Sequence, residues 1–570
     1  MRALKRILGG WFAGLAFQAC AAANISEADA ARFLTQATFG PTPNDIAHVQ
    51  RIGYEAWIDE QLKLPLPALS HQAYWDQQNK VLSKRGDQAS TDEVTASFWR
   101  MAITHQDQLR QRMAFALSEI FVVSLADSCG DVKNARSVAH FVDELNRHAF
   151  GSFESLLHTI SLHPAMGCFL SHRGNQKEDP ESGRMPDENF ARELLQLFSI
   201  GLNQLNIDGS PKLDAQGNLI PSYNQNDVAG LAKVMTGFSW ACPMPRNQRC
   251  FFEGVNGQTG ASFPDRLILP MAEYPQFHSQ SSKSFLGHTI PANSGLSPTE
   301  ELEQALRVIA DHPNVAPFIS KQLIQRFVTS NPSPQYIAGV AGVFETSKGN
   351  LGAVIKAILL SPEARQREVA LHPTFGKLRE PVLRLSALLR ATGGMSVSGE
   401  FLMRPTHDHG FGLAQSPMRS PSVFNFFRPG YVAPNSSMAA AGLVSPEMQI
   451  MTEVSAAGYV NYMRGFLEWG IGWNGPDKKT GPVDVQLRFN LDENEEFIKL
   501  IDDPERFIET LNVRLFGGAM SDFLREQMRS VINDMYEPAQ TRADQTLVKR
   551  RQIRSALLLA CASADFLVQR

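Results

Sequence analysis

Apolar residues recur every three or four positions along most of the chain, which is the spacing of one face of an α-helix. Residues 93–124 carry the longest such pattern, with Trp99, Ile103, Leu109 and Met113 among the apolar positions, and they predict one or two buried helices. Further segments repeat the pattern and often start at a proline or stop at a glycine, as helices do. The other predicted helices cover residues 28–38, 43–52, 54–62, 138–149, 153–161, 186–200, 226–236, 298–311, 314–329, 333–346, 351–360, 381–391, 446–469, 503–515, 520–535 and 547–568.

Strand signals are confined to the middle of the chain. Residues 205–223 contain an Asp-Gly and a Gln-Gly turn pair, and residues 267–290 suit short paired strands. The pattern therefore predicts a mainly α fold, a large multi-helical globular body with a small β-hairpin insertion in the middle. We expect a single region over residues 24–570, with helical parts at 24–200 and 298–570 and a part rich in loops and β-hairpins at 201–297.

The first 23 residues predict an export signal peptide. An apolar stretch, residues 7–17, follows three basic side chains and precedes the small residues 19–23. We expect the mature chain to begin near Asn24, within residues 20–26. The apolar stretch is too short for the roughly 20 residues that span a bilayer, and no later segment is long and uncharged enough, so we expect no transmembrane segment in the mature protein. The signal indicates a Sec-type route to the periplasm, the cell surface or the medium. The three basic residues are Arg2, Lys5 and Arg6.

Composition and cysteine positions narrow the class of protein further. The 58 acidic residues exceed the 54 basic ones, for a net charge of −4, so the chain lacks the positive field of a nucleic-acid binder. In an oxidising compartment cysteines tend to pair. Cys242 and Cys250 are eight positions apart, and we expect a disulfide that adds about 2–3 kcal/mol on the loop-entropy model. Cys129 and Cys168 are candidates for a second bridge, whereas Cys561 lies in an apolar run and is expected to be a buried free thiol.

Standard catalytic and cofactor motifs are missing, and we expect neither a cofactor nor a metal. A Gly-x-Gly-x-x-Gly pattern ends at Gly475, but it follows a helical segment, whereas a dinucleotide site needs a strand before it and a helix after it. The run His407-Asp408-His409 is interpreted as a solvated loop rather than a metal site. Asp208 and neighbouring polar residues are explained by their turns rather than by calcium, because their spacing is wrong for a helix-loop-helix calcium site.

Residues 187–201 have a mixture of charged and apolar residues that is typical of neither a protein surface nor a protein core. On a helix, Asn189, Arg192, Glu193 and Gln196 share one narrow stripe, and apolar residues cover most of the remaining circumference. Charged groups at the edge of a buried helix must be paired, because an unpaired buried charge costs several kcal/mol. The stripe is therefore either a structural polar network or a functional site. A second stripe, formed by Arg110, Arg112 and Glu119, is a candidate source of these partners, but the favoured interpretation of this second stripe is purely structural.

The polar stripes and several further motifs along the chain together resemble a bacterial family called domain of unknown function 1800. The motif Asn425-Phe-Phe-Arg-Pro-Gly-Tyr431 is one of several that occur in the family's order. The resemblance covers nearly the whole mature chain and implies a large, exported and mainly helical protein with no established reaction. The other segments that carry it are residues 109–124, 163–167, 187–201, 227–228 with 236–238, 283–287, 312–328 and 515–518.

The chain departs from the family pattern at some of these positions. It has Asp187 where the family has Asn, Phe190 where it has Tyr, and Gln196 where a Glu is frequent, but it keeps the four candidate residues. Family members often carry His-Asp where this chain has His278-Ser279. The four candidate residues are Glu188, Asn189, Arg192 and Glu193.

Two functions fit these observations. The first is a scaffold or assembly partner of another exported protein, for which the resemblance implies the family called domain of unknown function 1501. The alternative is a hydrolase that acts on a cell-surface or extracellular polymer, with Glu188 or Glu193 as general acid or base and with Asn189 and Arg192 orienting the substrate. We expect Glu193→Ala to destabilise the fold by unpairing a buried Arg192, and Glu188→Ala to be tolerated.

Overall fold

The computed structural model describes residues 25–126, 132–243, 246–256, 258–261, 263–475, 481–535 and 541–570. The predicted signal peptide, residues 1–23, lies outside this part, as does Cys129 of the second expected disulfide. The described chain is mainly α-helical, with short antiparallel strands, so the predicted fold class is confirmed. Among the described helices none is both long and apolar enough to cross a bilayer.

Several helices in the first half of the chain pack directly against α6 (Gln108–Ser118). Several helices begin at a capping box, as α2 does, where Thr42 and Asp45 bond each other's backbone amides. The helices of this half are α1 (Glu27–Ala37), α2 (Pro43–Ile52), α3 (Tyr54–Lys63), α4 (His71–Ser83), α5 (Thr91–Thr104), α6 (Gln108–Ser118), α7 (Val132–His148), α8 (Phe153–Leu162), α9 (Pro164–Phe169), α10 (Asn189–Gln196), α11 (Gln225–Val234) and α12 (Gln248–Glu253).

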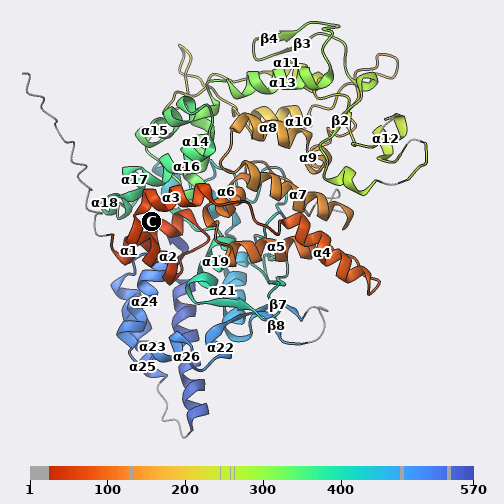
Figure 1. Cartoon of the computed structure of the whole chain (residues 1–570). Helices are drawn as coiled ribbons and strands as arrows, with labels where there is room; N and C mark the ends of the chain where they lie inside the picture. Colours follow the sequence, from red (N-terminus) through yellow and green to blue (C-terminus); the bar gives the residue numbers. More distant parts are fainter. Residues whose placement is uncertain are drawn as a thin grey trace, which may run out of the picture.

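The second half adds the helices that surround this body. In Figure 1, α14, α15 and α16 lie beside α6 and α8, and the blue C-terminal helices lie at the opposite end from α11 and α13. The helices are α13 (Pro298–Ala310), α14 (Val315–Phe327), α15 (Pro334–Thr346), α16 (Leu351–Leu360), α17 (Pro362–Arg365), α18 (Arg367–Ala370), α19 (Pro381–Ala391), α20 (Ser437–Ala440), α21 (Glu453–Trp469), α22 (Arg488–Leu491), α23 (Glu496–Leu500), α24 (Pro504–Phe516), α25 (Asp522–Asp534), α26 (Arg542–Ala562) and α27 (Ala564–Leu567).

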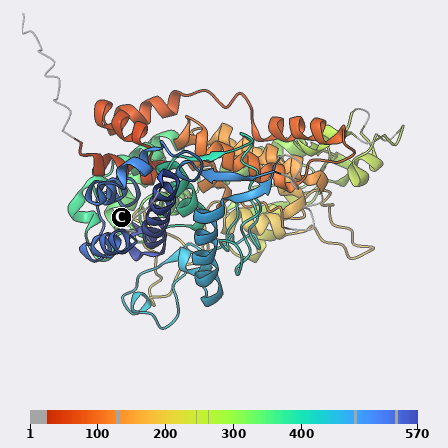
Figure 2. The same ribbon diagram turned by 90° about the horizontal axis from the view of Figure 1, so that it is seen from below.

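The strands form small antiparallel sheets. β3 (Lys283–Phe285) and β4 (His288–Ile290) form a hairpin within residues 267–290, as expected, whereas β2 (Ala272–Glu273) pairs with β1 (Phe238–Ser239), which lies outside the predicted strand segments. The other segment predicted to contain strands, residues 205–223, has isolated antiparallel pairings in place of named strands. The hairpin β3–β4 lies on α11 at Gly230, where a Cβ would sit 1.9 Å from the Ser284 carbonyl oxygen, so a glycine is required. Figure 1 shows this hairpin at the opposite end of the molecule from the blue C-terminal helices, and Figure 2 shows the red N-terminal helices along one edge.

The expectation that strands occur only in the middle is wrong. β5 (Lys377–Leu378) pairs with the chain end β9 (Val568–Gln569), and β6 (Gly394–Ser396), β8 (Val483–Leu487) and β7 (Ile471–Asn474) form a three-stranded sheet. The glycine pattern that ends at Gly475 thus lies on a strand that follows a helix, which is not the dinucleotide-binding order. These strands are only two to five residues long, and the pairs β5–β9 and β6–β8 join segments far apart in sequence, so local periodicity carries little signal for them.

Two other expectations need adjustment. The helix predicted at 446–469 is a short 3-10 turn, Pro446–Ile450, followed by α21, because Thr452 caps a new helix with Ser455. The helix predicted at 186–200 is shorter, since α10 ends at Gln196. Cys242 and Cys250 form the expected disulfide, with their Cα atoms 6.0 Å apart, and Cys561 is a buried free thiol as predicted.

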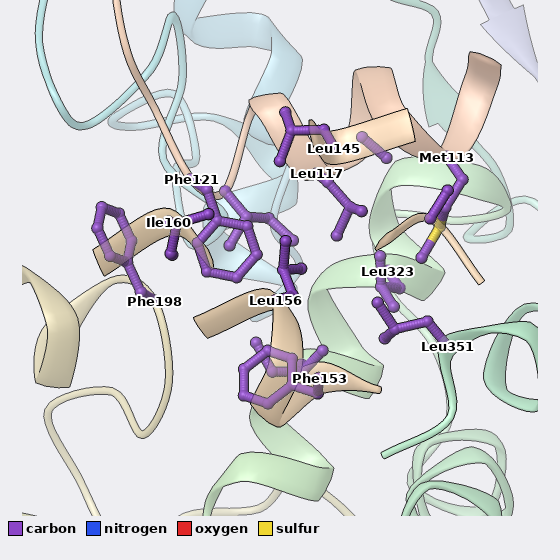
Figure 3. Close-up of a cluster of buried hydrophobic side chains, with 14 of the residues drawn as sticks. Met113, Leu117, Phe121, Leu145, Phe153, Leu156, Ile160, Phe198, Leu323 and Leu351 are labelled. Carbon is purple, nitrogen blue, oxygen red and sulfur yellow. The ribbon is translucent and has the colours of Figure 1, made fainter. Parts of the chain in front are cut away.

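The core is formed largely by aromatic and aliphatic side chains that converge on α6. Figure 3 shows Met113 and Leu117 of α6 packed with Leu156 of α8, Leu323 of α14 and Leu351 of α16. Each such side chain contributes about 1.5–3 kcal/mol when fully buried. A second cluster joins α5, α19, α21 and α24–α26. The position of α6 next to α14 is the part of the fold that shapes the candidate site.

Candidate functional site

The polar stripe on α10 is an ion-pair network at the surface of the molecule. Arg192 Nη2 lies 2.9 Å from Glu188 Oε2, one helical turn earlier, and Gln225 Nε2 on α11 donates to the same oxygen at 2.7 Å. The Arg192 and Glu188 side chains are 38% and 33% exposed. Because these groups pair with one another in contact with water, the network contributes little to stability.

The other residues of this stripe have separate environments. Asn189 is exposed, and its backbone amide donates to Asp187 Oδ1 at 2.8 Å. Glu193 is buried, its Oε2 accepts no hydrogen bond, and burial raises the pKa of its carboxyl. Gln196 accepts a hydrogen bond from the Tyr223 hydroxyl at 3.2 Å. The expected buried pair of Arg192 with Glu193 is wrong, because successive helical residues do not face each other and Glu188 is one turn away.

The arginines of the second stripe contact neighbours other than α10, which agrees with the structural interpretation favoured for this stripe. Arg110 Nε lies 3.3 Å from Asp107 Oδ2, and the guanidinium of Arg110 covers the ring of Phe150. Arg112 is buried and donates to the Arg326 carbonyl oxygen at 2.6 Å. Both arginines therefore tie α6 to its own neighbours.

A cavity of about 430 Å³ lies between α10 and α14. Phe318, Gln322 and Arg326 are spaced by four residues, so they project from one face of α14. Gln196 and Leu197 enter it from the C-terminal end of α10. The remaining lining residues come from the segment after α6, the segment after α10 and the loop 423–429: Glu119, Ile120, Gly201, Leu202, Val423, Phe424, Phe427, Arg428 and Pro429.

Specific contacts fix the walls of this cavity. Asn425 takes a left-handed backbone conformation with φ of 60°, and its Nδ2 donates to Glu119 Oε1 at 3.3 Å. Gln325 Nε2 donates to the Pro429 carbonyl oxygen at 3.2 Å. Gly201, with φ of 73°, lies so close to Phe318 that a Cβ would be 2.7 Å from the ring. The loop and the α10 connection are therefore held against α14.

The floor of the cavity is a buried ionic network. Arg326 Nε lies 3.4 Å from Glu119 Oε2, and both side chains are less than 5% exposed. Behind them Lys377 Nζ lies 3.6 Å from Glu380 Oε1 and 3.0 Å from Glu447 Oε1, and it donates to the Arg326 carbonyl oxygen at 2.9 Å. Removing Lys377 would leave Glu380 and Glu447 buried without their shared cation.

Two neighbouring carboxyl groups of this floor have pKa values that move in opposite directions. Burial and the adjacent Glu380 raise the pKa of Glu119 well above its usual range. Burial acts on Glu380 too, but Lys377 and the hydrogen bond with Glu119 outweigh it and lower the pKa of Glu380 to about 2. A protonated Glu119 beside an ionised Glu380 is the arrangement expected when two close carboxyl groups share one proton. Glu119 is the one that lines the cavity.

An exposed segment flanks the cavity, and we call residues 202–223 the apolar arm. Its large apolar side chains Leu202, Ile207, Leu213 and Leu219 are 42–56% exposed. Leu213 lies opposite Leu219 in an antiparallel pairing, so the two side chains share one face. The arm is anchored by Asn314, whose Nδ2 donates to the Asn203 carbonyl oxygen at 2.7 Å.

Comparison with protein families gives a match over most of the chain. A family model described as a protein of unknown function, DUF1800, matches residues 32–568. The chain therefore belongs to the DUF1800 family. No curated protein and no solved structure gives a significant match. The cavity is formed where four segments that carry the sequence resemblance meet: residues 109–124, 187–201, 312–328 and 425–431.

Sequence reasoning did not select the residues that define this cavity. The spacing of Phe318, Gln322 and Arg326 in the predicted helix 314–329 is a signal that would have placed them on one face. Glu119 was considered only as a partner for α10. No local signal joins it to Glu380, because the contact depends on tertiary packing.

Proposed function

We propose that this chain is a scaffold or assembly partner of another exported protein, which it binds through the apolar arm. The observation that carries the proposal is the exposure of large apolar side chains on residues 202–223 next to the cavity. Contiguous exposed apolar residues are typical of sites of protein–protein interaction. Proteins of the domain of unknown function 1501 family, which the sequence resemblance implies as partners, are the first candidates.

The geometry of α10 favours this function over catalysis at Glu188. The Glu188 carboxylate is neutralised by Arg192 and bonded to Gln225. A general acid or base needs a proton that substrate can reach and a pKa near the working pH. The Glu188 side chain is 33% exposed and is held by Arg192 and Gln225, so water is not excluded from it.

The test is capture of the partner with a tagged mature chain from its host, followed by mass spectrometry. The double variant Leu213→Ser/Leu219→Ser should lose the captured protein. The matched control is Leu371→Ser/Leu491→Ser, which changes two leucines that are 54% and 53% exposed elsewhere on the molecule. Equal capture by the arm variant and the wild-type chain would contradict the proposal.

A second candidate function is hydrolysis of a cell-surface or extracellular polymer. The observation that favours it is Glu119, a carboxyl group with a raised pKa at the floor of a cavity. In this case Glu119 replaces Glu188 and Glu193 as the candidate general acid. Glu119→Gln should abolish release of soluble fragments from host envelope polymer while thermal unfolding stays unchanged. If Glu188→Gln, rather than Glu119→Gln, abolishes the release of soluble fragments, the catalytic carboxyl group lies on α10 and not at the cavity.

A further inference from the structure

The polar groups at the cavity present hydrogen-bond donors. Arg428 is exposed at the cavity, its guanidinium stacks 4.5 Å from the Phe424 ring centre, and among the described residues it has no ion-pair partner. Gln322 is 93% buried, and its Nε2 makes no hydrogen bond to any residue that the structure describes. A buried amide without a partner is costly, because it has lost its water without gaining a bond. A ligand with hydrogen-bond acceptors would satisfy both groups.

The carboxyl group in the cavity does not cancel this preference. Glu119 Oε2 faces Arg326, and Glu119 Oε1 accepts from Asn425. Its raised pKa also favours the neutral form, so it adds little negative charge to the cavity. The network beneath it contains more cationic than anionic groups, since Arg112, Arg326, Lys377 and Arg384 surround Glu119, Glu380 and Glu447. The field in the cavity is therefore positive.

The remaining walls are apolar. They include the rings of Phe318, Phe424 and Phe427 and the side chains of Leu197 and Val423. A volume of about 430 Å³ lies within the range of small-molecule sites, which combine apolar walls with a few polar groups. Such a cavity suits a ligand with an apolar body and a single charged end.

We propose that the cavity binds a small apolar molecule that ends in a carboxylate, with Arg428 and the amide of Gln322 as its polar contacts. A planar guanidinium bonds a carboxylate through two parallel hydrogen bonds. The Arg428 guanidinium, which pairs with no described carboxylate, and the Gln322 amide both line the cavity, and together they can donate to the two oxygens of a monoanion. This site goes beyond the proposed partner binding, because it is a property of the chain alone.

The test is calorimetric titration of the purified mature chain with decanoate and with decanol, which have the same chain length. Decanoate should bind, and decanol should bind at least about tenfold more weakly, because it cannot form the charge-assisted bonds. Arg428→Gln should weaken decanoate binding by about tenfold and leave decanol binding unchanged. The matched control is Arg404→Gln, since Arg404 is also exposed and stacks on an aromatic ring, that of Trp473 at 4.3 Å, without lining the cavity.

A second variant locates the site without relying on charge. Val423→Trp places an indole in the cavity from a half-buried wall position, and it should abolish binding of decanoate. The proposal is overturned if decanoate does not bind, if decanol binds equally well, or if Val423→Trp leaves binding intact. Because no partner protein is present, these results do not depend on the docking proposed for the apolar arm.

Discussion

The pair Glu188–Arg192 on α10 and the pair Glu119–Arg326 at the cavity contain the same two residue types but differ in their surroundings. The first pair is one-third exposed and completes its bonding with Gln225. The second is buried, and it adjoins further buried charges. In water the attraction between two charges is weak, whereas in the interior both the attraction and the cost of desolvation are large. The comparison shows that burial, not residue type, decides how much desolvation a pair of charged side chains must overcome.

The largest expected effect concerns the cavity floor. Lys377→Met should lower the free energy of unfolding by about 3–5 kcal/mol, because it leaves Glu380 and Glu447 buried without their shared cation. Denaturant unfolding measures it. The matched control is Lys356→Met, which removes a lysine bonded to Asp59 and Glu55 at the surface and should cost less than about 1 kcal/mol. Equal losses in both variants would show that burial does not distinguish the two regions.

The next largest effect is a difference in stability between substitutions at Glu380 and at Glu119, the two neighbouring carboxyl groups of the cavity floor. Glu380→Gln should cost about 3 kcal/mol, because it removes an ionised group that compensates Lys377. Glu119→Gln should cost less than about 1 kcal/mol, because the amide resembles the protonated carboxyl that burial favours. Denaturant unfolding of the two variants under the same conditions measures the difference. A larger loss in Glu119→Gln would contradict the assignment of the proton.

The pKa values of Glu380 and Glu119 shift in opposite directions, so the two groups contribute to stability over opposite pH ranges. The pKa of Glu380 is lowered to about 2, so its stabilising contribution is present above the ordinary glutamate pKa of about 4.3 and is lost as pH falls toward 2. The pKa of Glu119 is raised, so its contribution is present at acidic pH and is lost as pH rises through the raised value. The deficit of Glu380→Gln relative to wild type should therefore shrink in acid.

Much of the fold could be predicted from the sequence, but the site could not. Helical periodicity placed most helices, because each amphipathic pattern is a local property of the chain. The pairing of Lys377 with Gln569 joins positions far apart in sequence, and it leaves no periodic trace. The prediction that the polar stripe lies on a helix is confirmed. Its surroundings depend on Gln225 of α11, a contact from another helix that the sequence of α10 does not reveal. The partners of Glu119 are likewise determined by how α6 meets α14 and the loop 423–429.

A smaller effect is expected at Glu193. Its folded pKa is raised by burial, so the wild-type chain is stabilised at acidic pH and loses that contribution as pH rises through the raised value. Glu193→Gln cannot ionise, so its thermal unfolding temperature should rise relative to wild type from acidic to neutral pH. The matched control is Glu188→Gln on the same helix, which removes the carboxylate that pairs with Arg192 and should not gain relative to wild type. If the unfolding temperature of Glu193→Gln instead falls relative to wild type as pH rises, Glu193 is ionised and paired in the folded chain.

The smallest effect tests whether the α10 pair is only a surface ion pair. A double-mutant cycle with Glu188→Gln and Arg192→Gln should give a coupling free energy of about 0.3–0.5 kcal/mol, the value for exposed pairs one helical turn apart. The coupling should disappear at about 1 M salt, where the Debye length falls to about 3 Å. Gln225 holds the Glu188 carboxylate from a second helix, so it is the one feature that would order the pair more than usual. A coupling above about 1 kcal/mol that persists in salt would mean that α10 presents a fixed charge arrangement, and the candidate site would then extend to this helix.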